Sequence, residues 1–530
     1  MIARTWLALV LVSFGVLQVA PARVKAADAP DKSRIFTFRM TSEPETLDWN
    51  KAHTAIETYL LMNLMEGLMT FDPKFKVTPA LAASYSLSKD QKTYTFKLKP
   101  GVKWSDGIPL KAQDFVYSWK RLISPVTGAS YAYLLFDVEG AEDFYKGKLT
   151  DFEKVGIKAR DDLTLEVKLL RPIANWIYIP TFWVTFPLRQ DVAEKYGSLS
   201  SSVWATPGRM VTLGPYKLVS HDIDSKIVME ANAGYYGEAG NIAQIVAQLV
   251  RDDSTALTLY ETGKLDMLVD LSTIDLKRLG GRQDLKSFPY FKVGYMGLVT
   301  NKYPFTNPKI RRAIAMAIDK SKISAILHGG QVGASSFVPT PMAGYSKNVG
   351  LPYNPEKAKK ELKEAGIDAS KPLSITITMP NSDKMLILGQ YLQAQLKTVL
   401  GMDVTLEPFD HKTFRAQLNI FAYPSFINSW SADFPDPDNF LSVFLSDSGN
   451  NKTTWKNPEF DQLVLSARTT SDAKLREKKY FEAQKKLLDD QAVVIPLYYE
   501  PNLALVKSRV QGLQINPLNY LILKRVNLGP

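Results

Sequence analysis

The sequence predicts an α/β fold that is divided into lobes with different arrangements of strands and helices. A chain of 530 residues with 45% apolar content is long enough to bury more than one core. From about residue 71 to 200, short segments alternate apolar and polar residues, which predicts antiparallel strands. After about residue 300, strands alternate with capped helices, which predicts a helix-covered sheet with parallel strands.

In the N-terminal half, the alternation of residues 35–40 predicts a half-buried strand. Residues 57–69 place their large apolar side chains on one broad face, which predicts a helix. Residues 93–99 and 162–169 alternate cleanly and are expected to be strands of the antiparallel unit.

Two Asn-Pro pairs mark helix starts in the C-terminal half, since asparagine is a good N-cap and proline fits the first helical position. The helix after Asn307 is expected to run to the glycines at 329–330, and the helix after Asn354 to run to Gly366.

The segment 373–406 has the pattern of a βαβ unit. A strand is expected over 373–379, a helix over 385–399 that stops at Gly401, and a second strand over 402–406. Such a unit requires a parallel pair of strands with the helix packed on one face.

The first 26 residues are expected to be a cleaved signal peptide. They combine a basic start, a short apolar run and small residues before the expected cleavage after Ala26, with Ala22 as a second choice. Because the chain has no cysteine, neither a lipid anchor nor a disulfide is expected. No other stretch approaches spanning length, so we expect the mature protein to be secreted and soluble.

The net charge of +11 falls to +8 once the three basic residues of the presequence are removed. The remaining basic residues are interspersed with nearly as many acids, as between Lys357 and Glu364. This pattern is typical of solvated helix faces and excludes nucleic acid as an expected partner.

Nothing in the sequence predicts an enzyme, a metal site or a cofactor. The four histidines have no metal-binding spacing, and no nucleophile elbow, phosphate-binding loop or dinucleotide fingerprint is present. The glycines at 329–333 follow a predicted helix instead of a strand, so we expect an ordinary loop there.

The densest cluster of functional candidates is the segment 433–438. Asp433, Asp436 and Asp438 could form a calcium loop or a carboxylate pair for glycoside hydrolysis, or they could simply cap a proline-shaped turn. The spacing and glycine of an EF-hand are missing. Trp430 and several phenylalanines crowd the segment, and a carboxylate among aromatic side chains pairs strongly with an ammonium group.

At this segment the sequence resembles the oligopeptide- and dipeptide-binding family of ABC-transporter substrate-binding proteins. The run SWSADFPDPDNFL at 429–441 carries the resemblance, and SEPETLD at 42–48, LKPGVKWSDG at 98–107 and DFVYSW at 114–119 support it. Further blocks at 213–216, 260–266 and 304–320 occur in the same order as in the family.

The resemblance implies a two-lobed periplasmic binding protein that closes about a hinge and carries an extra domain inserted in its first lobe. Lobe I would comprise residues 27–70, 200–295 and 501–530, with 71–199 as the inserted subdomain. Lobe II would comprise residues 296–500. A short peptide would lie extended between the lobes, held by main-chain hydrogen bonds, and would be delivered to an ABC import permease. A monomer is expected.

Carried over residue by residue, Asp433 matches the family position that binds the ligand's α-ammonium group. Trp430 and Ser431 match its neighbours in the pocket, and Glu43 matches an acidic residue near the same end. A tyrosine contact corresponds to Tyr131 or Tyr133, and the resemblance leaves open which of the two.

The family's means of holding the peptide's carboxyl end are largely replaced in this chain. Leu418 stands where the oligopeptide type has an arginine that meets the carboxylate, and Met385 stands where it has a histidine with a similar role. Near the ammonium site, Ile427 stands where the family has a second arginine. His411 corresponds to a pocket tryptophan, and Arg415 could act as a substitute carboxylate partner or be an ordinary surface arginine.

Two alternatives to peptide capture stay open at this point. The same fold could bind an oligosaccharide or another solute through aromatic stacking. A secreted hydrolase using Asp433 with Asp436 or Asp438 belongs to a different functional class, and it lacks any further catalytic constellation.

Overall fold

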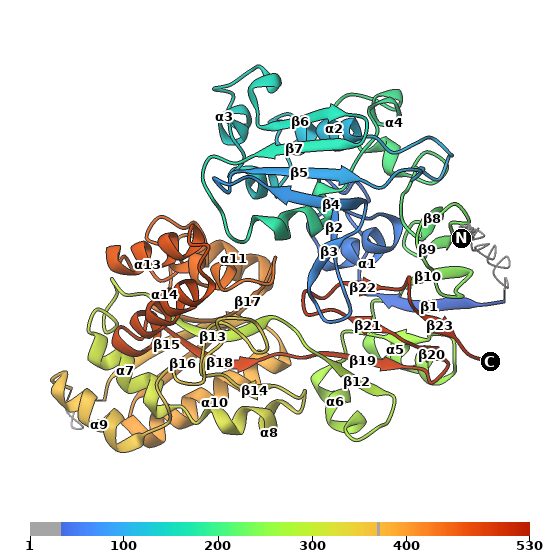
Figure 1. Ribbon diagram of the computed structural model, residues 1–530. Coiled ribbons are helices and arrows are strands. Elements are labelled where there is room, and N and C mark those ends of the chain that lie inside the picture. The colour runs from blue at the N-terminus through green and yellow to red at the C-terminus, as the bar shows by residue number, and fades with distance from the viewer. Residues whose placement is uncertain (1–32, 368–371) are drawn as a thin grey trace, which may run out of the picture.

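The computed structural model describes residues 33–367 and 372–530 (Figure 1). The predicted signal peptide, residues 1–26, lies outside these described residues. Within them, no helix is both long enough and apolar enough to cross a membrane.

The first lobe is built on a seven-stranded sheet whose strands come from distant parts of the chain. Its order is β12-β19-β11-β1-β10-β9-β8, with β1 (Ile35–Met40) parallel to β10 (Gln244–Leu249). Phe36, Phe38 and Met40 of β1 are buried, as the alternation of this segment predicts. The other strands are β8 (Tyr216–Asp222), β9 (Lys226–Ala231), β11 (Met267–Leu268), β12 (Leu285–Phe288) and β19 (Asn502–Val506).

An inserted unit stands above this sheet in Figure 1. Its antiparallel sheet has the order β4-β5-β7-β6 and carries helix α2 (Ala112–Leu122) on one face. The antiparallel strands predicted around 93–99 and 162–169 are confirmed in this sheet. Its strands are β4 (Ala82–Leu87), β5 (Thr93–Leu98), β6 (Ile157–Asp161) and β7 (Thr164–Lys168).

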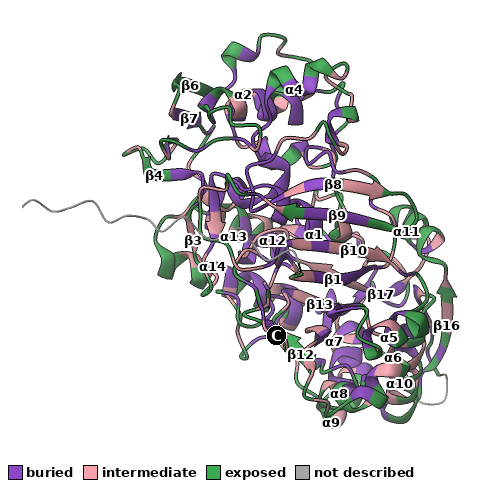
Figure 2. Cartoon of the chain, turned by 90° about the vertical axis from the view of Figure 1, so that its right-hand side faces the viewer, coloured by how far each residue is buried: buried purple, intermediate pink, exposed green. Residues whose placement is uncertain are grey.

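A fully buried ion pair fastens the inserted unit to the first lobe. Arg121, on α2, donates from Nη1 and Nη2 to the two carboxylate oxygens of Asp48, at 2.8 and 2.5 Å. Asn50 accepts a further bond from Arg121 at 2.9 Å, and the Ser202 hydroxyl donates to Asp48. Buried residues run without a break from the first sheet into the inserted unit, so the two share one core (Figure 2).

The second lobe contains a six-stranded mixed sheet of order β14-β18-β13-β17-β15-β16. Helix α10 (Asp383–Leu400) connects the parallel strands β15 and β16, and Gly401 ends it with φ of 68°. The predicted βαβ unit is thereby confirmed. The strands are β13 (Lys292–Leu298), β14 (Val332–Gly333), β15 (Ser374–Pro380), β16 (Asp403–Phe409), β17 (Ser425–Ser431) and β18 (Val494–Tyr499).

The two faces of this sheet carry different helices. α7 (Pro308–Ala317), α9 (Pro355–Glu364) and α10 pack on one face around a core that includes Ile377 and Leu392. On the other face, Phe337, Phe440 and Phe444 pack against Tyr295 of β13 or against one another. Helices α12 (Pro437–Leu441), α13 (Pro458–Arg468) and α14 (Ala473–Lys485) belong to this second layer.

The chain crosses directly between the two main sheets at β12–β13 and at β18–β19 (Figure 1). The crossings lie side by side, because the Glu500 N–H donates to the Lys292 carbonyl at 3.2 Å. The Glu500 carboxylate also meets the ammonium groups of Lys292, at 3.4 Å, and Lys384. This arrangement has the geometry expected of a hinge between two lobes.

Two predicted helices are shorter in the structure than in the sequence analysis. Helix α1 (Ala55–Leu64) ends before Met65, which is extended with φ of −135°, so the prediction of helix to residue 69 is wrong. Helix α7 ends at Ala317 instead of reaching Gly329, because Ile318 is extended and the Asp319 side chain caps a new 3-10 turn. Both Asn-Pro helix starts are confirmed.

Candidate functional site

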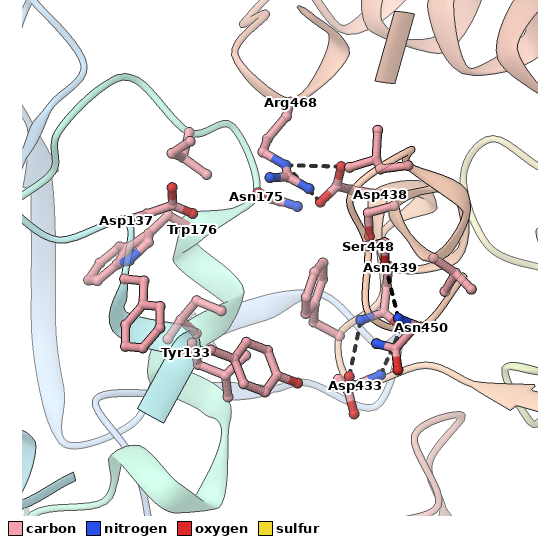
Figure 3. A pocket seen from close by; sticks show the side chains of 18 of the residues that line it. Tyr133, Asp137, Asn175, Trp176, Asp433, Asp438, Asn439, Ser448, Asn450 and Arg468 are labelled. Carbon is pink, nitrogen blue, oxygen red and sulfur yellow. Dashed lines mark hydrogen bonds and ion pairs between the residues drawn. The ribbon is translucent and has the colours of Figure 1, made fainter. Parts of the chain in front are cut away.

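Asp433 follows the end of β17, in the turn that leads into α12 (Figure 3). The turn is shaped by Pro435 and by Asp436, whose side chain accepts the Asp438 N–H at 2.9 Å as the N-cap of α12. The predicted proline-shaped, capped turn is confirmed. It holds Asp433 half-buried at the edge of the second lobe, facing the inserted unit.

The side-chain amide of Asn439 organises this edge. Its Oδ1 accepts the Asp433 N–H at 3.2 Å and the Trp430 indole N–H at 3.1 Å, and its Nδ2 donates to Asp433 Oδ2 at 3.4 Å. Asn439 is itself buried. The orientation of the Asp433 carboxylate is therefore set by hydrogen bonds from the protein.

Two tyrosines of the inserted unit face Asp433 across the gap between the lobes. The Tyr133 hydroxyl points toward the carboxylate (Figure 3). The Tyr131 ring lies 5.8 Å from that of Tyr133 and packs edge-on against Trp183. Burial and the nearby Asp433 charge raise the pKa of both tyrosines, so both stay protonated donors at neutral pH.

Burial raises the pKa of Asp433 to about 6, and the hydrogen bonds from Asn439 and Tyr133 lower it in part. No arginine, lysine or histidine forms an ion pair with this carboxylate among residues 33–367 and 372–530. A desolvated carboxylate without a counter-ion is unfavourable unless a cation arrives from outside. The site is thus prepared for a cationic group.

A cavity of about 450 Å³ opens beside Asp433, between the inserted unit and the second lobe. Tyr133, Asp137 and Trp176 line it from the inserted unit, and Trp430 and Asp433 line it from the second lobe. Two parts of the chain that are almost 300 residues apart in sequence therefore line the same cavity.

Asp436 and Asp438 are structural residues in this arrangement. The Asp436 carboxylate is buried and accepts from Arg476 at 2.6 Å. Asp438 is also buried and accepts from Arg468 Nε at 3.1 Å with both oxygens. Each of these carboxylates is thus committed to an arginine, which leaves neither free to serve as the second acid of a hydrolase. The described residues contain no cluster of ligands able to hold a metal ion.

The other predicted site residues are distributed over both lobes. Ser431 lies at the end of β17, where its hydroxyl is 3.2 Å from that of Tyr290. Glu43 is bonded to His221 and accepts the Asp224 N–H at 3.1 Å, so its contacts lie at the β8–β9 turn and none reaches Asp433. His411 and Arg415 are exposed on α11 (His411–Asn419) and do not line the cavity beside Asp433.

The residues that replace the family's polar ligand-binding side chains belong to the core. Leu418 and Met385, at the positions for the carboxyl end, and Ile427, at the position near the ammonium site, are all buried among apolar neighbours. The sequence analysis did not single out Asn439 or the buried Tyr520, whose pKa is raised by burial and by the charge of Asp433. Asn439 lies six residues after Asp433 across a proline turn, a local signal that could have identified it.

Comparison with known proteins places this arrangement in a family. Residues 76–452 match the model for bacterial extracellular solute-binding proteins, family 5. The chain belongs to this family. The periplasmic oligopeptide-binding protein OppA of Salmonella typhimurium is 32% identical, with 97% of this chain and 98% of the relative aligned.

Other members of family 5 show how far this likeness extends. The probable deoxycholate-binding periplasmic protein YgiS of Escherichia coli is 31% identical over 96% of this chain and 97% of its own length. The unliganded open form of the murein tripeptide-binding protein MppA superposes with a TM-score of 0.80 at 26% identity, covering 94% of this chain and 98% of that structure. The predicted family and its two-lobed α/β fold are thereby confirmed.

Proposed function

We propose that the protein captures short peptides between its lobes, with Asp433 binding the ligand's α-ammonium group, and delivers them to an ABC import permease. The observation that carries this proposal is the Asp433 carboxylate, half-buried, oriented by Asn439 and left without a cation among the described residues. The peptide-binding relatives support the same class of ligand.

Capture of an amine requires no bond-making, which agrees with a binding protein and not an enzyme. An ammonium group entering beside Asp433 would replace water with a charge-assisted hydrogen bond in a partly desolvated place. The side chains of Trp430, Tyr131 and Tyr133 would surround the ligand's first residue. Ser431, at the end of β17, would contact the main chain of the ligand.

Three other predicted site residues, Glu43, His411 and Arg415, lie away from Asp433 in this structure, and roles in ligand binding are still proposed for them. Glu43 would approach only if the β8–β9 turn moves toward the second lobe on closure. Arg415 and His411, exposed on α11, are proposed to meet more distant parts of a longer ligand, with Arg415 as a partner for a carboxylate.

The proposed setting is the periplasm, where a monomer free of any lipid anchor would carry the ligand to its permease. The signal-peptide pattern and the absence of cysteine support this setting, and the periplasmic relatives agree with it. No cofactor or metal is needed for the proposed role.

The test is to denature the purified protein, identify the released ligand by mass spectrometry and titrate the ligand-free protein by calorimetry. A tripeptide with a free amine is expected to bind at least a hundredfold more tightly than its N-acetylated form, because acetylation removes the charge that pairs with Asp433. Deoxycholate and an oligosaccharide mixture serve as comparison ligands. Equal affinity for the two tripeptides, or binding of only a comparison ligand, would refute the proposal.

A further inference from the structure

The cavity beside Asp433 extends away from the carboxylate into the space between the inserted unit and α13. At its far side the two parts of the chain touch, because the Ala174 N–H donates to the Arg468 carbonyl at 3.0 Å. A ligand whose amine is held at Asp433 therefore has a half-open cavity of about 450 Å³ next to its first residue.

The walls of this cavity carry an excess of negative charge. Five carboxylates face two guanidinium groups, and no lysine or histidine lines the cavity, so the lining residues have a formal charge of −3. The carboxylates belong to Asp137, Glu142, Asp433, Asp438 and Asp447, and the guanidinium groups to Arg171 and Arg468.

Both guanidinium groups are already occupied by cavity carboxylates. Arg468 bonds to both oxygens of Asp438 (Figure 3). Arg171 Nη2 lies 3.1 Å from Asp137 Oδ1. Glu142 is paired with Lys146, which does not line the cavity. Asp433 and Asp447 form no ion pair with any residue that the structure describes, and Asp433 is assigned to the ligand's amine, so Asp447 is the carboxylate left to pair with a side chain. An anionic group entering the cavity would meet this excess charge, whereas a cationic group would be attracted by it.

The rest of the lining is apolar enough to hold a hydrocarbon stem. Apolar side chains from both walls contribute, and they include Leu134, Ile173, Trp176, Ile179, Phe434 and Val443. Lysine and arginine side chains combine such a stem with a cationic head, so their chemistry matches both features of the cavity.

We infer that this cavity receives the first side chain of the bound peptide and selects a basic one, lysine or arginine, over neutral or acidic residues. The inference rests on the proposed function, since it assumes that the ligand's amine lies at Asp433. It adds a specificity that main-chain recognition alone would not provide.

The test compares three tripeptides that differ only in their first residue: lysine, norleucine and glutamate, each followed by two alanines. Calorimetry at low ionic strength is expected to show the lysine peptide binding about tenfold more tightly than the norleucine peptide, and the glutamate peptide most weakly. The advantage of lysine should shrink as salt is added, because the charges are only partly buried.

The variant Asp447→Asn is expected to lower the ratio of the lysine and norleucine affinities by about threefold, because it removes one cavity charge. Glu477→Gln, on the exposed face of α14, is the matched control and should leave the ratio unchanged. Equal affinity for the lysine and norleucine peptides would overturn the inference while leaving the proposed function intact. Failure of every free-amine peptide to bind would instead refute the proposed function.

Discussion

Asn439 is bonded to Asp433 at both ends of its side-chain amide: Oδ1 accepts the Asp433 backbone N–H, and Nδ2 donates to the Asp433 carboxylate. The same Oδ1 accepts the indole N–H of Trp430. A single buried amide thereby fixes the turn, the carboxylate and the neighbouring aromatic wall before any ligand is present. Preorganisation of this kind lowers the entropic cost of binding.

Replacing this amide should affect binding and stability together. Asn439→Ala leaves the Trp430 indole N–H and the Asp433 backbone N–H without a partner, so the free energy of unfolding should fall by about 1–3 kcal/mol. Affinity for a free-amine peptide should fall about tenfold, because the carboxylate is no longer held in place. Urea denaturation and calorimetry measure the two effects.

The matched control is Asn450→Ala, which removes an exposed amide that lines the same cavity without bonding to Asp433. It should change neither quantity appreciably. A loss of stability in the Asn439 variant with unchanged affinity would show that the amide supports the turn alone.

The charge of Asp433 should dominate amine recognition. Asp433→Asn keeps the size and the hydrogen-bonding capacity of the side chain, yet should weaken binding of a free-amine peptide by about 2–5 kcal/mol. Affinity for the N-acetylated peptide should change far less, since that ligand brings no charge to the site. Similar losses for both peptides in calorimetry would contradict the assignment.

Peptide affinity should depend on pH through the same carboxylate. Because the pKa of Asp433 in the ligand-free protein is about 6, an increasing fraction is protonated below that pH, and affinity should fall up to about tenfold per pH unit. Affinity should be highest near pH 7 and should fall again above about pH 8, where the ligand's own α-amine loses its proton. Binding should release protons between pH 5 and 6, which calorimetry in buffers of different ionisation enthalpy detects.

Stability should show the opposite trend in this pH range. Since folding raises the pKa of Asp433 above its ordinary value of 3.8, the folded state holds the proton more tightly. The resulting contribution to stability is complete below about pH 4 and is lost as pH rises through 6. Asp433→Asn should abolish this part of the pH dependence, and an unchanged profile would contradict the raised pKa.

The buried pair of Asp48 and Arg121 should be essential for stability. Arg121→Met leaves the Asp48 carboxylate uncompensated in the core and should lower the free energy of unfolding by about 3–5 kcal/mol. Arg160→Met, which breaks an exposed pair with Glu166, should have little effect. Chemical denaturation compares the two, and equal losses would contradict the importance of burial.

Local signals in the sequence predicted much of the second lobe. The Asn-Pro starts at Asn307 and Asn354 and the stop at Gly401 were right because caps depend on residues within one turn. The end of α7 was missed, although Asp319 is itself a capping residue, because apolar periodicity continues past it.

Local sequence could predict the part of the candidate site that lies on the second lobe, but not its contact with the inserted unit. Asp433 and Trp430 lie close in sequence, so the resemblance could identify them together. Their contact with Tyr133 depends on the docking of a unit 300 residues earlier in the chain, which no local pattern encodes. Similarly, the exposure of Arg415 and the pairing of Glu43 with His221 follow from tertiary packing alone.

The place of β19 in the first sheet has a consequence for the order in which the two lobes can fold. This strand, near the C-terminal end of the sequence, lies between β11 and β12, so it completes the interior of a sheet begun by β1. The second lobe is instead formed by one continuous stretch of chain. That lobe can fold as a unit while the first sheet still lacks its last interior strand, so the unpaired edges of β11 and β12 are where a partly folded chain is most prone to wrong pairing.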